Sequence, residues 1–263
     1  MKICECRVLL TGASGGIGQA LATALLSEGA QVLLVARQLD GLQPLVQAYP
    51  GQVSLVAADI RQPSGRDAVL AAAQRFGGLN TLINAAGVNH FGLLDEQSET
   101  AIAELIDLNV TATLQLTQRL LPLLRRQKRA LLVNLGSTFG SIGYPGFSTY
   151  CASKFALRGF SEALRRELAD TQVKVLYFAP RATRTPMNVS RVVAMNKQLK
   201  VAMDAPEHVA QVLLATLRRE EEERYLGWPE RLFVRLNSLL PRLVDQALRK
   251  QLPTILRFAR DHH

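Results

Sequence analysis

Short apolar runs alternate with longer amphipathic stretches over the first 180 residues of the chain. The runs fall at 7–11, 31–36, 53–58, 81–86, 130–136 and 173–179. The amphipathic stretches fall at 16–28, 66–76, about 99–127 and about 150–170. Because the runs are apolar on both faces, they are typical of strands in a parallel sheet that helices cover on both sides. The pattern predicts a single-domain, doubly wound α/β fold with right-handed crossovers.

The pattern changes after residue 180. Residues 180–205 resemble a loop with helical pieces, 206–223 a helix, and 224–228 a short last strand. Residues 229–263 have apolar positions at helical spacing, which predicts one or two amphipathic helices interrupted near Pro241 and Pro253. We therefore expect a main domain at 1–227, with a substrate lid at about 184–205, and a C-terminal extension at 228–263.

Composition is that of a globular protein with a substantial core. Of 263 residues, 48% are apolar and 20% charged, and every apolar run is shorter than a membrane-spanning helix requires. Three of the first seven residues are charged where a secretory signal would be apolar, so we expect a cytoplasmic protein. The three cysteines and four histidines show no metal-ligand spacing, which predicts reduced thiols and no metal site.

A glycine-rich turn, T-G-A-S-G-G-I-G at 11–18, joins the first predicted strand to the first predicted helix. Glycines let the backbone turn tightly and approach a pyrophosphate, and the helix N-terminus then favours its negative charge. The position of the turn between strand and helix predicts nucleotide binding.

Further motifs follow this turn, and together they resemble the short-chain dehydrogenase/reductase family over residues 7 to 227. They are T-G-x-x-x-G-x-G with Thr11, Gly12, Gly16 and Gly18, then Asp59, N-A-A-G at 84–87, Asn109, Ser137, Tyr150 and Lys154. The resemblance implies a Rossmann fold that binds a nicotinamide cofactor, with Asp59 at the adenine ring and Asn84 bracing the sheet. Taken alone, Asn84 is also compatible with a simple backbone tie and Asp59 with a turn cap. The candidate cofactor-binding residues are Thr11, Gly12, Ser14, Gly16, Ile17, Gly18, Arg37, Asp59, Ile60, Asn84, Ala85, Ala86, Gly87, Tyr150, Lys154, Pro180, Thr183 and Thr185.

Cofactor choice depends on the end of the second strand, where an acidic residue would bind the adenosine ribose and repel a 2′-phosphate. Here Ala36 is followed by Arg37. A guanidinium forms forked, charge-assisted hydrogen bonds with phosphate, and Ser14 could assist it. We therefore expect NADP(H) in preference to NAD(H), the alternative being a solvated arginine.

The candidate catalytic residues are Asn109, Ser137, Tyr150 and Lys154. On a helix, Lys154 lies one turn after Tyr150, so its ammonium can favour the phenolate of a group whose ordinary pKa is about 10. Proton transfer near neutral pH would require that pKa to fall by about three units. Ser137, at the end of the fifth strand, would hydrogen-bond the substrate oxygen, and the resemblance implies that Asn109 holds a water for proton supply. Taken alone, Ser137 is also compatible with a strand-end turn, and Asn109 with a kink or a solvated side chain.

One segment departs from the family pattern. Members carry Pro-Gly after the sixth strand, whereas this chain reads P-R-A-T-R-T at 180–185, with Arg181 in place of the glycine. Arginine does not readily take the positive φ that glycine allows, so a different backbone is expected here. Thr183 or Thr185 would still meet the nicotinamide carboxamide.

Substrate class is indicated only by apolar side chains. Three of the four methionines, Met187, Met195 and Met203, lie in or beside the expected lid, and three aromatic residues follow Ser137, at 139, 144 and 147. Flexible thioethers and aromatic rings favour a hydrophobic carbonyl compound over a sugar, although core packing would explain the methionines equally well.

Net charge is +9, of which residues 224–263 contribute +5. The C-terminal extension could pack on the body, on a second subunit of a homodimer or homotetramer, or on an anionic membrane. Nucleic-acid binding is disfavoured, because no recognisable module is present. A second basic cluster at Arg125, Arg126, Lys128 and Arg129 could bind an acidic carrier protein, with a solvated helix end as the alternative.

These features favour an NADP(H)-dependent carbonyl reductase or alcohol dehydrogenase that acts on a hydrophobic ketone or secondary alcohol, with Tyr150 as general acid/base. A reductase of 3-oxoacyl groups on acyl carrier protein is the alternative within enzymes. A non-catalytic cofactor-binding sensor or scaffold is the alternative of another class.

Overall fold

The computed structural model describes residues 1–260, and positions 261–263, including His262 and His263, lie outside the described part. Its centre is a seven-stranded parallel sheet in the order β3-β2-β1-β4-β5-β6-β7. The strands are β1 Arg7–Thr11, β2 Gln31–Ala36, β3 Val53–Ala57, β4 Thr81–Asn84, β5 Ala130–Leu135, β6 Val173–Ala179 and β7 Glu223–Tyr225. The order reverses between β1 and β4, which places a ligand crevice at the carboxyl ends of these strands. The predicted doubly wound fold is confirmed.

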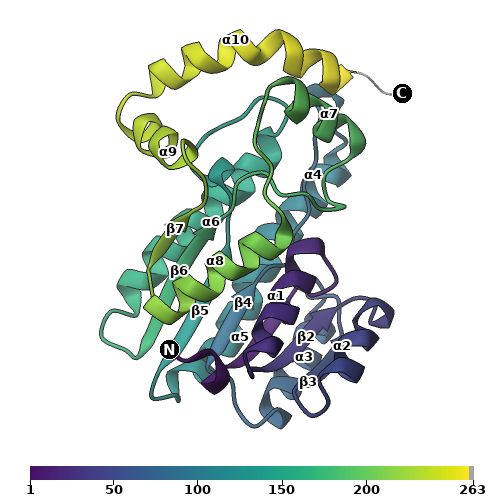
Figure 1. Ribbon diagram of the computed structural model, residues 1–263, viewed down its shortest axis with the longest axis vertical. Coiled ribbons are helices and arrows are strands. Elements are labelled where there is room, and N and C mark those ends of the chain that lie inside the picture. Colours follow the sequence, from purple (N-terminus) through teal and green to yellow (C-terminus); the bar gives the residue numbers. More distant parts are fainter. Residues whose placement is uncertain (261–263) are drawn as a thin grey trace.

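Helices cover both faces of the sheet (Figure 1). They are α1 Gly16–Ser27, α2 Gln43–Ala48, α3 Pro63–Arg75, α4 Glu99–Ile106, α5 Thr113–Arg125, α6 Ser148–Glu167, α7 Ser190–Gln198, α8 Pro206–Arg219, α9 Glu230–Leu239 and α10 Pro241–Arg260. Alternate strand residues enter different cores. Leu10 packs with α1 and α8, whereas Leu9 packs with α3, α5 and α6. This explains why the strands are apolar on both faces.

The stretch predicted as one helix at about 99–127 is divided. Between α4 and α5 the chain forms a π-helical segment, η4 Asp107–Ala112, which contains the buried Asn109. The side-chain amide of Asn109 forms hydrogen bonds with groups outside this segment. Segments of π-helix often occur at functional sites. Helical periodicity alone does not reveal this widened turn.

The C-terminal extension forms α9 and α10, which lie beyond the carboxyl ends of the strands, at the opposite end of the molecule from the N-terminus (Figure 1). The predicted break occurs at Pro241, the first residue of α10, but the break predicted at Pro253 is wrong. Proline there removes one backbone donor, yet buried Ile255 and Ala259 pack in one cluster with Val192 and Met195 of α7, and this packing stabilises the helix. Among the described helices, none combines the length and apolar content needed to cross a bilayer.

Candidate active site

Three of the four candidate catalytic residues line one cavity of about 310 Å³ at the carboxyl end of the sheet. Ser137 follows β5, and α6 carries Tyr150 and Lys154 one turn apart, with the lysine Nζ 5.7 Å from the centre of the tyrosine ring. Asn109 is fully buried beside this group. A Cβ atom on Gly87 would lie 3.1 Å from Asn109 Oδ1 and 3.8 Å from Lys154 Nζ, so glycine allows this close packing.

The protonation of Tyr150 differs from the sequence-based expectation. Burial raises the pKa of Tyr150 to about 12, and the hydrogen bond with Ser137 only partly opposes the rise. Burial also lowers the pKa of Lys154 to about 8, while its Nζ donates to the carbonyl of Leu135 at 2.9 Å. The expected lowering of the Tyr150 pKa by Lys154 is therefore not found, because desolvation of the phenol dominates and only the hydrogen bond with Ser137 opposes it. At neutral pH the phenol is protonated, which is the form that can donate a proton.

Asn109 fixes the loop that follows β4. Its Oδ1 accepts from the N–H of Val88 at 2.8 Å, and its Nδ2 donates to the Val88 carbonyl at 2.9 Å and to Ser153 Oγ at 3.0 Å. Ser153 in turn donates to the Tyr150 carbonyl at 2.7 Å. The Asn109 amide thus joins the loop to the helix of Tyr150 and Lys154, and no motif in the sequence indicates this connection. The water-holding role of Asn109 stays a prediction.

The glycine turn has the geometry that a pyrophosphate needs. Gly12 has a φ of +66°, and a Cβ atom there would lie 2.7 Å from the Ala85 carbonyl oxygen. A Cβ atom on Gly18 would lie 2.1 Å from the Gly12 carbonyl oxygen, so neither position accepts a side chain. Helix α1 begins at Gly16 after Gly15, without a side-chain cap on its first N–H groups. These donors fit a phosphate, and neighbouring Ile17 lines the cavity.

Two predicted cofactor residues make framework contacts. The Thr11 hydroxyl accepts from the N–H groups of Ala85 and Ala86, both at 3.1 Å, and so joins the ends of β1 and β4. Asn84 donates through Nδ2 to Thr117 Oγ1 and Asn134 Oδ1, both at 2.9 Å. These side chains are buried and brace the strand ends, which positions the loops around the cavity.

The ends of β2 and β3 form the expected adenosine side of the site. Arg37 is exposed, and Ser14 is exposed in the glycine turn. The carboxylate of Asp59 bonds with the Arg61 guanidinium, at 2.6 Å between Oδ2 and Nη2, and this bond lowers the pKa of Asp59. Arg61 was not among the predicted residues, although its place two residues after the aspartate was a usable signal. Ile60 is buried in the core.

Apolar side chains dominate the cavity wall. Phe139 stacks on Tyr144, with ring centres 4.9 Å apart, and both line the cavity with Phe147. Of the three methionines considered, Met187 and Met195 line it and Met203 does not. The sequence reasoning missed the wall formed by the C-terminal extension, which consists of Glu230, Phe233, Val244, Ala247, Leu248 and Gln251. Helical spacing predicted that α10 has an apolar face, but not that this face covers the site.

The segment after β6 holds Arg181 at the position where the family pattern has glycine. Arg181 is not among the described non-glycine residues with positive φ, and its guanidinium bonds both Asp204 Oδ1, at 2.8 Å, and Glu230 Oε2, at 3.2 Å. Arg181 thus does not adopt the positive φ that glycine would allow, and its side chain instead joins Asp204 to Glu230. We call these three residues the Arg181 clamp. Pro180, Thr183 and Thr185 still line the cavity, and Thr185 packs on Gly16 of the glycine turn.

The basic cluster at 125–129 lies away from the cavity. It ends α5 and precedes β5, so it lies at the amino end of the sheet, whereas Ser137 follows the carboxyl end of β5. Arg129 forms an ion pair with Glu220. Over residues 1–260, no group of three or more His, Cys, Asp or Glu side chains is placed to hold a metal ion.

Comparison with known proteins agrees with this geometry. The short chain dehydrogenase family matches residues 7–196. The chain is 30% identical over 222 residues to a 3-oxoacyl-[acyl-carrier-protein] reductase from Thermotoga maritima, covering 81% of this chain and 89% of the relative.

Two solved structures have the same fold. A short chain dehydrogenase from Burkholderia cenocepacia, in complex with NADP, has a TM-score of 0.81 at 25% identity and covers 94% of this chain and 99% of its own. One from Burkholderia phymatum, in complex with NAD, has a TM-score of 0.82 at 22% identity and covers 93% and 96%. The family match over most of the chain, together with this fold, shows that the chain belongs to the short-chain dehydrogenase/reductase family and is an oxidoreductase of that family.

Proposed function

We propose that the protein is an NADP(H)-dependent carbonyl reductase or alcohol dehydrogenase that transfers a hydride between the nicotinamide and a hydrophobic ketone or secondary alcohol. One observation carries the proposal. Ser137, Tyr150 and Lys154 line one largely apolar cavity together with Ile17 of the glycine turn. This arrangement supports a site in which a nicotinamide and an apolar carbonyl compound lie together.

Each residue has a defined part in this proposal. The bound cofactor supplies or accepts the hydride. The N–H groups at the start of α1 and the glycine turn hold its pyrophosphate. Ser137 orients the substrate oxygen, and the neutral phenol of Tyr150 donates a proton to that oxygen during reduction. Lys154 then stabilises the phenolate that remains. We infer that residues 184–205 form the lid over this site.

The preference for NADP(H) rests on Arg37, since one of the two neighbouring structures binds NADP and the other NAD. The Arg37 guanidinium is exposed and has no ion pair with any residue from 1 to 260, whereas the Asp59 carboxylate is already paired with Arg61. A 2′-phosphate would give Arg37 a charged partner. No acidic residue at this strand end competes for the ribose hydroxyls.

Reduction of 3-oxoacyl groups on acyl carrier protein is the second candidate, and the Thermotoga maritima relative favours it. The position of the 125–129 cluster at the amino end of the sheet argues against that cluster as the docking site. If this candidate is right, carrier-bound substrate turns over faster than the same free thioester. A non-catalytic sensor is disfavoured, because all four catalytic candidates are present and grouped.

A turnover screen tests the proposal. Purified protein is offered apolar ketones, aldehydes and free and carrier-bound 3-oxoacyl thioesters, with NADPH and with NADH, and cofactor absorbance is followed. We expect turnover of an apolar ketone or aldehyde with NADPH. Turnover only of the carrier-bound thioester would favour the second candidate. Cofactor binding without turnover of any compound would favour the sensor.

A further inference from the structure

Apolar side chains lie on the outer face of α9 and of the turn into α10. Leu239 is 79% exposed, and Leu232, Leu240 and Leu243 are each about half exposed. We call these four residues the apolar patch. Trp228, just before α9, is 75% exposed as well. Helix α9 and this turn project at one edge of the molecule (Figure 1). Exposed apolar residues gathered in this way mark an interaction surface.

The opposite face of α9 is anchored to the body. Glu230 pairs with Arg181, Val234 is buried, and Asn237 Nδ2 donates to the Ser141 carbonyl at 2.9 Å. These residues share a helix face that points away from Leu232 and Leu239. The apolar patch is therefore held outward by specific contacts, and the helix cannot bury it by rotation without breaking them.

The charge around the patch is strongly positive. Acidic residues in α9 and α10 are limited to Glu230, which is paired, and Asp245. Basic residues are Arg231, Arg235, Arg242, Arg249, Lys250, Arg257 and Arg260. None of these seven forms an ion pair within residues 1–260. Arg257 does donate to Gln198 Oε1, so the surface combines apolar side chains with cations that have no carboxylate partner among the described residues.

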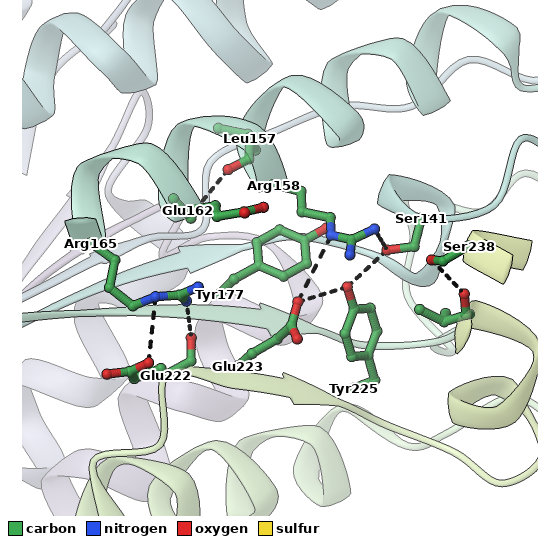
Figure 2. A network of polar contacts seen from close by, with 12 residues as sticks. Ser141, Leu157, Arg158, Glu162, Arg165, Tyr177, Glu222, Glu223, Tyr225 and Ser238 are labelled. Atoms are coloured by element: carbon green, nitrogen blue, oxygen red, sulfur yellow. Dashed lines mark hydrogen bonds and ion pairs between the residues drawn. The ribbon is translucent and has the colours of Figure 1, made fainter. Parts of the chain in front are cut away.

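A polar cavity of about 350 Å³ lies beside the patch. Four arginines line it, Arg158, Arg224, Arg231 and Arg235, with Glu221, Glu223 and Leu239. Figure 2 shows how Arg158 is engaged, since it donates to Ser141 Oγ at 3.0 Å and lies 3.8 Å from Glu223. By contrast, Arg231 and Arg235 form no ion pair among the described residues. Arg224 pairs with Glu221 at 3.5 Å, while its Nε is buried without a hydrogen bond among these residues. The cavity therefore has unpaired positive charge suited to a phosphate group.

These charges decide between two partners for the surface. A two-fold contact with a second copy would place the same patch against itself and bring the unpaired arginines of both copies together. An anionic bilayer instead offers hydrocarbon to the leucines and phosphates to the arginines. Charge complementarity favours the bilayer.

We propose that α9 and the start of α10 bind an anionic phospholipid surface. The apolar patch enters the region between the lipid headgroups and the acyl chains. Arg231 and Arg235 contact headgroup phosphates, and one such phosphate occupies the polar cavity. The same two helices form part of the catalytic cavity, through Phe233 and Leu248. This arrangement would let a lipophilic substrate enter the cavity from the bilayer, a consequence that rests on the proposed function. The binding itself is independent of the reaction.

Vesicle flotation of the full chain tests the binding. Phosphatidylcholine vesicles with and without phosphatidylglycerol are compared, at low and high salt. We expect binding only to the vesicles with phosphatidylglycerol, weakened by salt. Replacing two leucines, in Leu239→Asn with Leu240→Asn, should lower affinity about a hundredfold, because each buried leucine contributes about tenfold or more. Arg231→Gln with Arg235→Gln should lower it about thirtyfold, since each basic residue near an anionic surface contributes about 1 kcal/mol.

The matched control is Arg125→Gln with Arg126→Gln, which removes the same charge at the amino end of the sheet. It should bind vesicles as the unaltered protein does, and circular dichroism should show all variants folded. The proposal is overturned by an unaltered protein that binds neither vesicle, or by an equal loss in the control. The proposal is also overturned if the leucine variant keeps its vesicle affinity and instead dissociates an oligomer in gel filtration. Binding of an acidic carrier protein, without binding of any vesicle, would overturn it too.

Discussion

Arg181 and Glu230 form an ion pair, with 3.2 Å between Nη1 and Oε2, that joins the carboxyl end of β6 to the first residue of α9. The other edge of the same guanidinium bonds both oxygens of Asp204, at 2.8 and 3.0 Å. One side chain thus connects the sheet, the end of the 184–205 segment and the C-terminal extension. All three border the cavity of the candidate active site, so this side chain holds its walls together.

Loss of the Glu230 contact should loosen the cavity wall that the C-terminal extension forms, without altering the candidate catalytic residues. For Glu230→Gln we expect KM for an apolar ketone to rise about fivefold with kcat nearly unchanged. The effect is modest because both partners of the pair keep some solvent contact and such pairs contribute about 1 kcal/mol. Steady-state kinetics measure it, with exposed Glu207→Gln as the matched control. An equal change in both variants would show that the Arg181 clamp does not shape the site.

The cofactor preference should depend on one guanidinium. For Arg37→Gln we expect KM for NADPH to rise about tenfold to a hundredfold, since hydrogen bonds with charged groups contribute about 1.5 to 3 kcal/mol. KM for NADH should stay the same, because NADH lacks the 2′-phosphate. Kinetics with both cofactors measure the difference, and Arg75→Gln, at an exposed helix end, controls for the lost charge. An equal rise in KM for both cofactors would show that Arg37 does not recognise the 2′-phosphate.

Burial of Lys154 should appear in stability as a function of pH. Its pKa falls from 10.5 to about 8 on folding, so between these values the unfolded chain binds more protons than the folded one, and stability rises with pH. Urea unfolding of the protein and of Lys154→Met at pH 7.5 and 10 measures this. From pH 7.5 to pH 10, the free energy of unfolding of the unaltered protein should rise by about 2 kcal/mol relative to that of Lys154→Met. A difference that is constant with pH would mean that Lys154 keeps an ordinary pKa.

The sequence was most informative where local chemistry repeats at fixed spacing. The alternation of strands and helices, the glycine turn at 11–18 and the pair Tyr150 and Lys154 could all be predicted, because each depends on neighbours within one or two elements. The predicted strands match the observed ones to within two residues up to β6. A kink at Asn109 was open from the sequence, because asparagine is a poor helix former, but its partner Val88, on a separate loop, was not predictable.

Long-range contacts explain the remaining differences. Arg181 was recognised as unusual, but its partners Asp204 and Glu230 lie 23 and 49 residues away, and no local pattern indicates them. The helix continues through Pro253 because its neighbours pack against α7, and this tertiary contact outweighs the local cost of proline. The raised pKa of Tyr150 likewise depends on neighbours from several elements, which surround this partly buried ring.

The central claim is that the Tyr150 hydroxyl transfers the proton during carbonyl reduction with NADPH. The ring packs edge-on against Phe139 and Phe147, with centres 6.4 and 6.3 Å away, so Tyr150→Phe keeps the ring contacts and removes the hydroxyl. NADPH oxidation with an apolar ketone is measured for both proteins, alongside NADPH binding by fluorescence. The account predicts a loss in kcat of about a thousandfold, with NADPH affinity unchanged within about twofold. Turnover by Tyr150→Phe at the rate of the unaltered protein would contradict it.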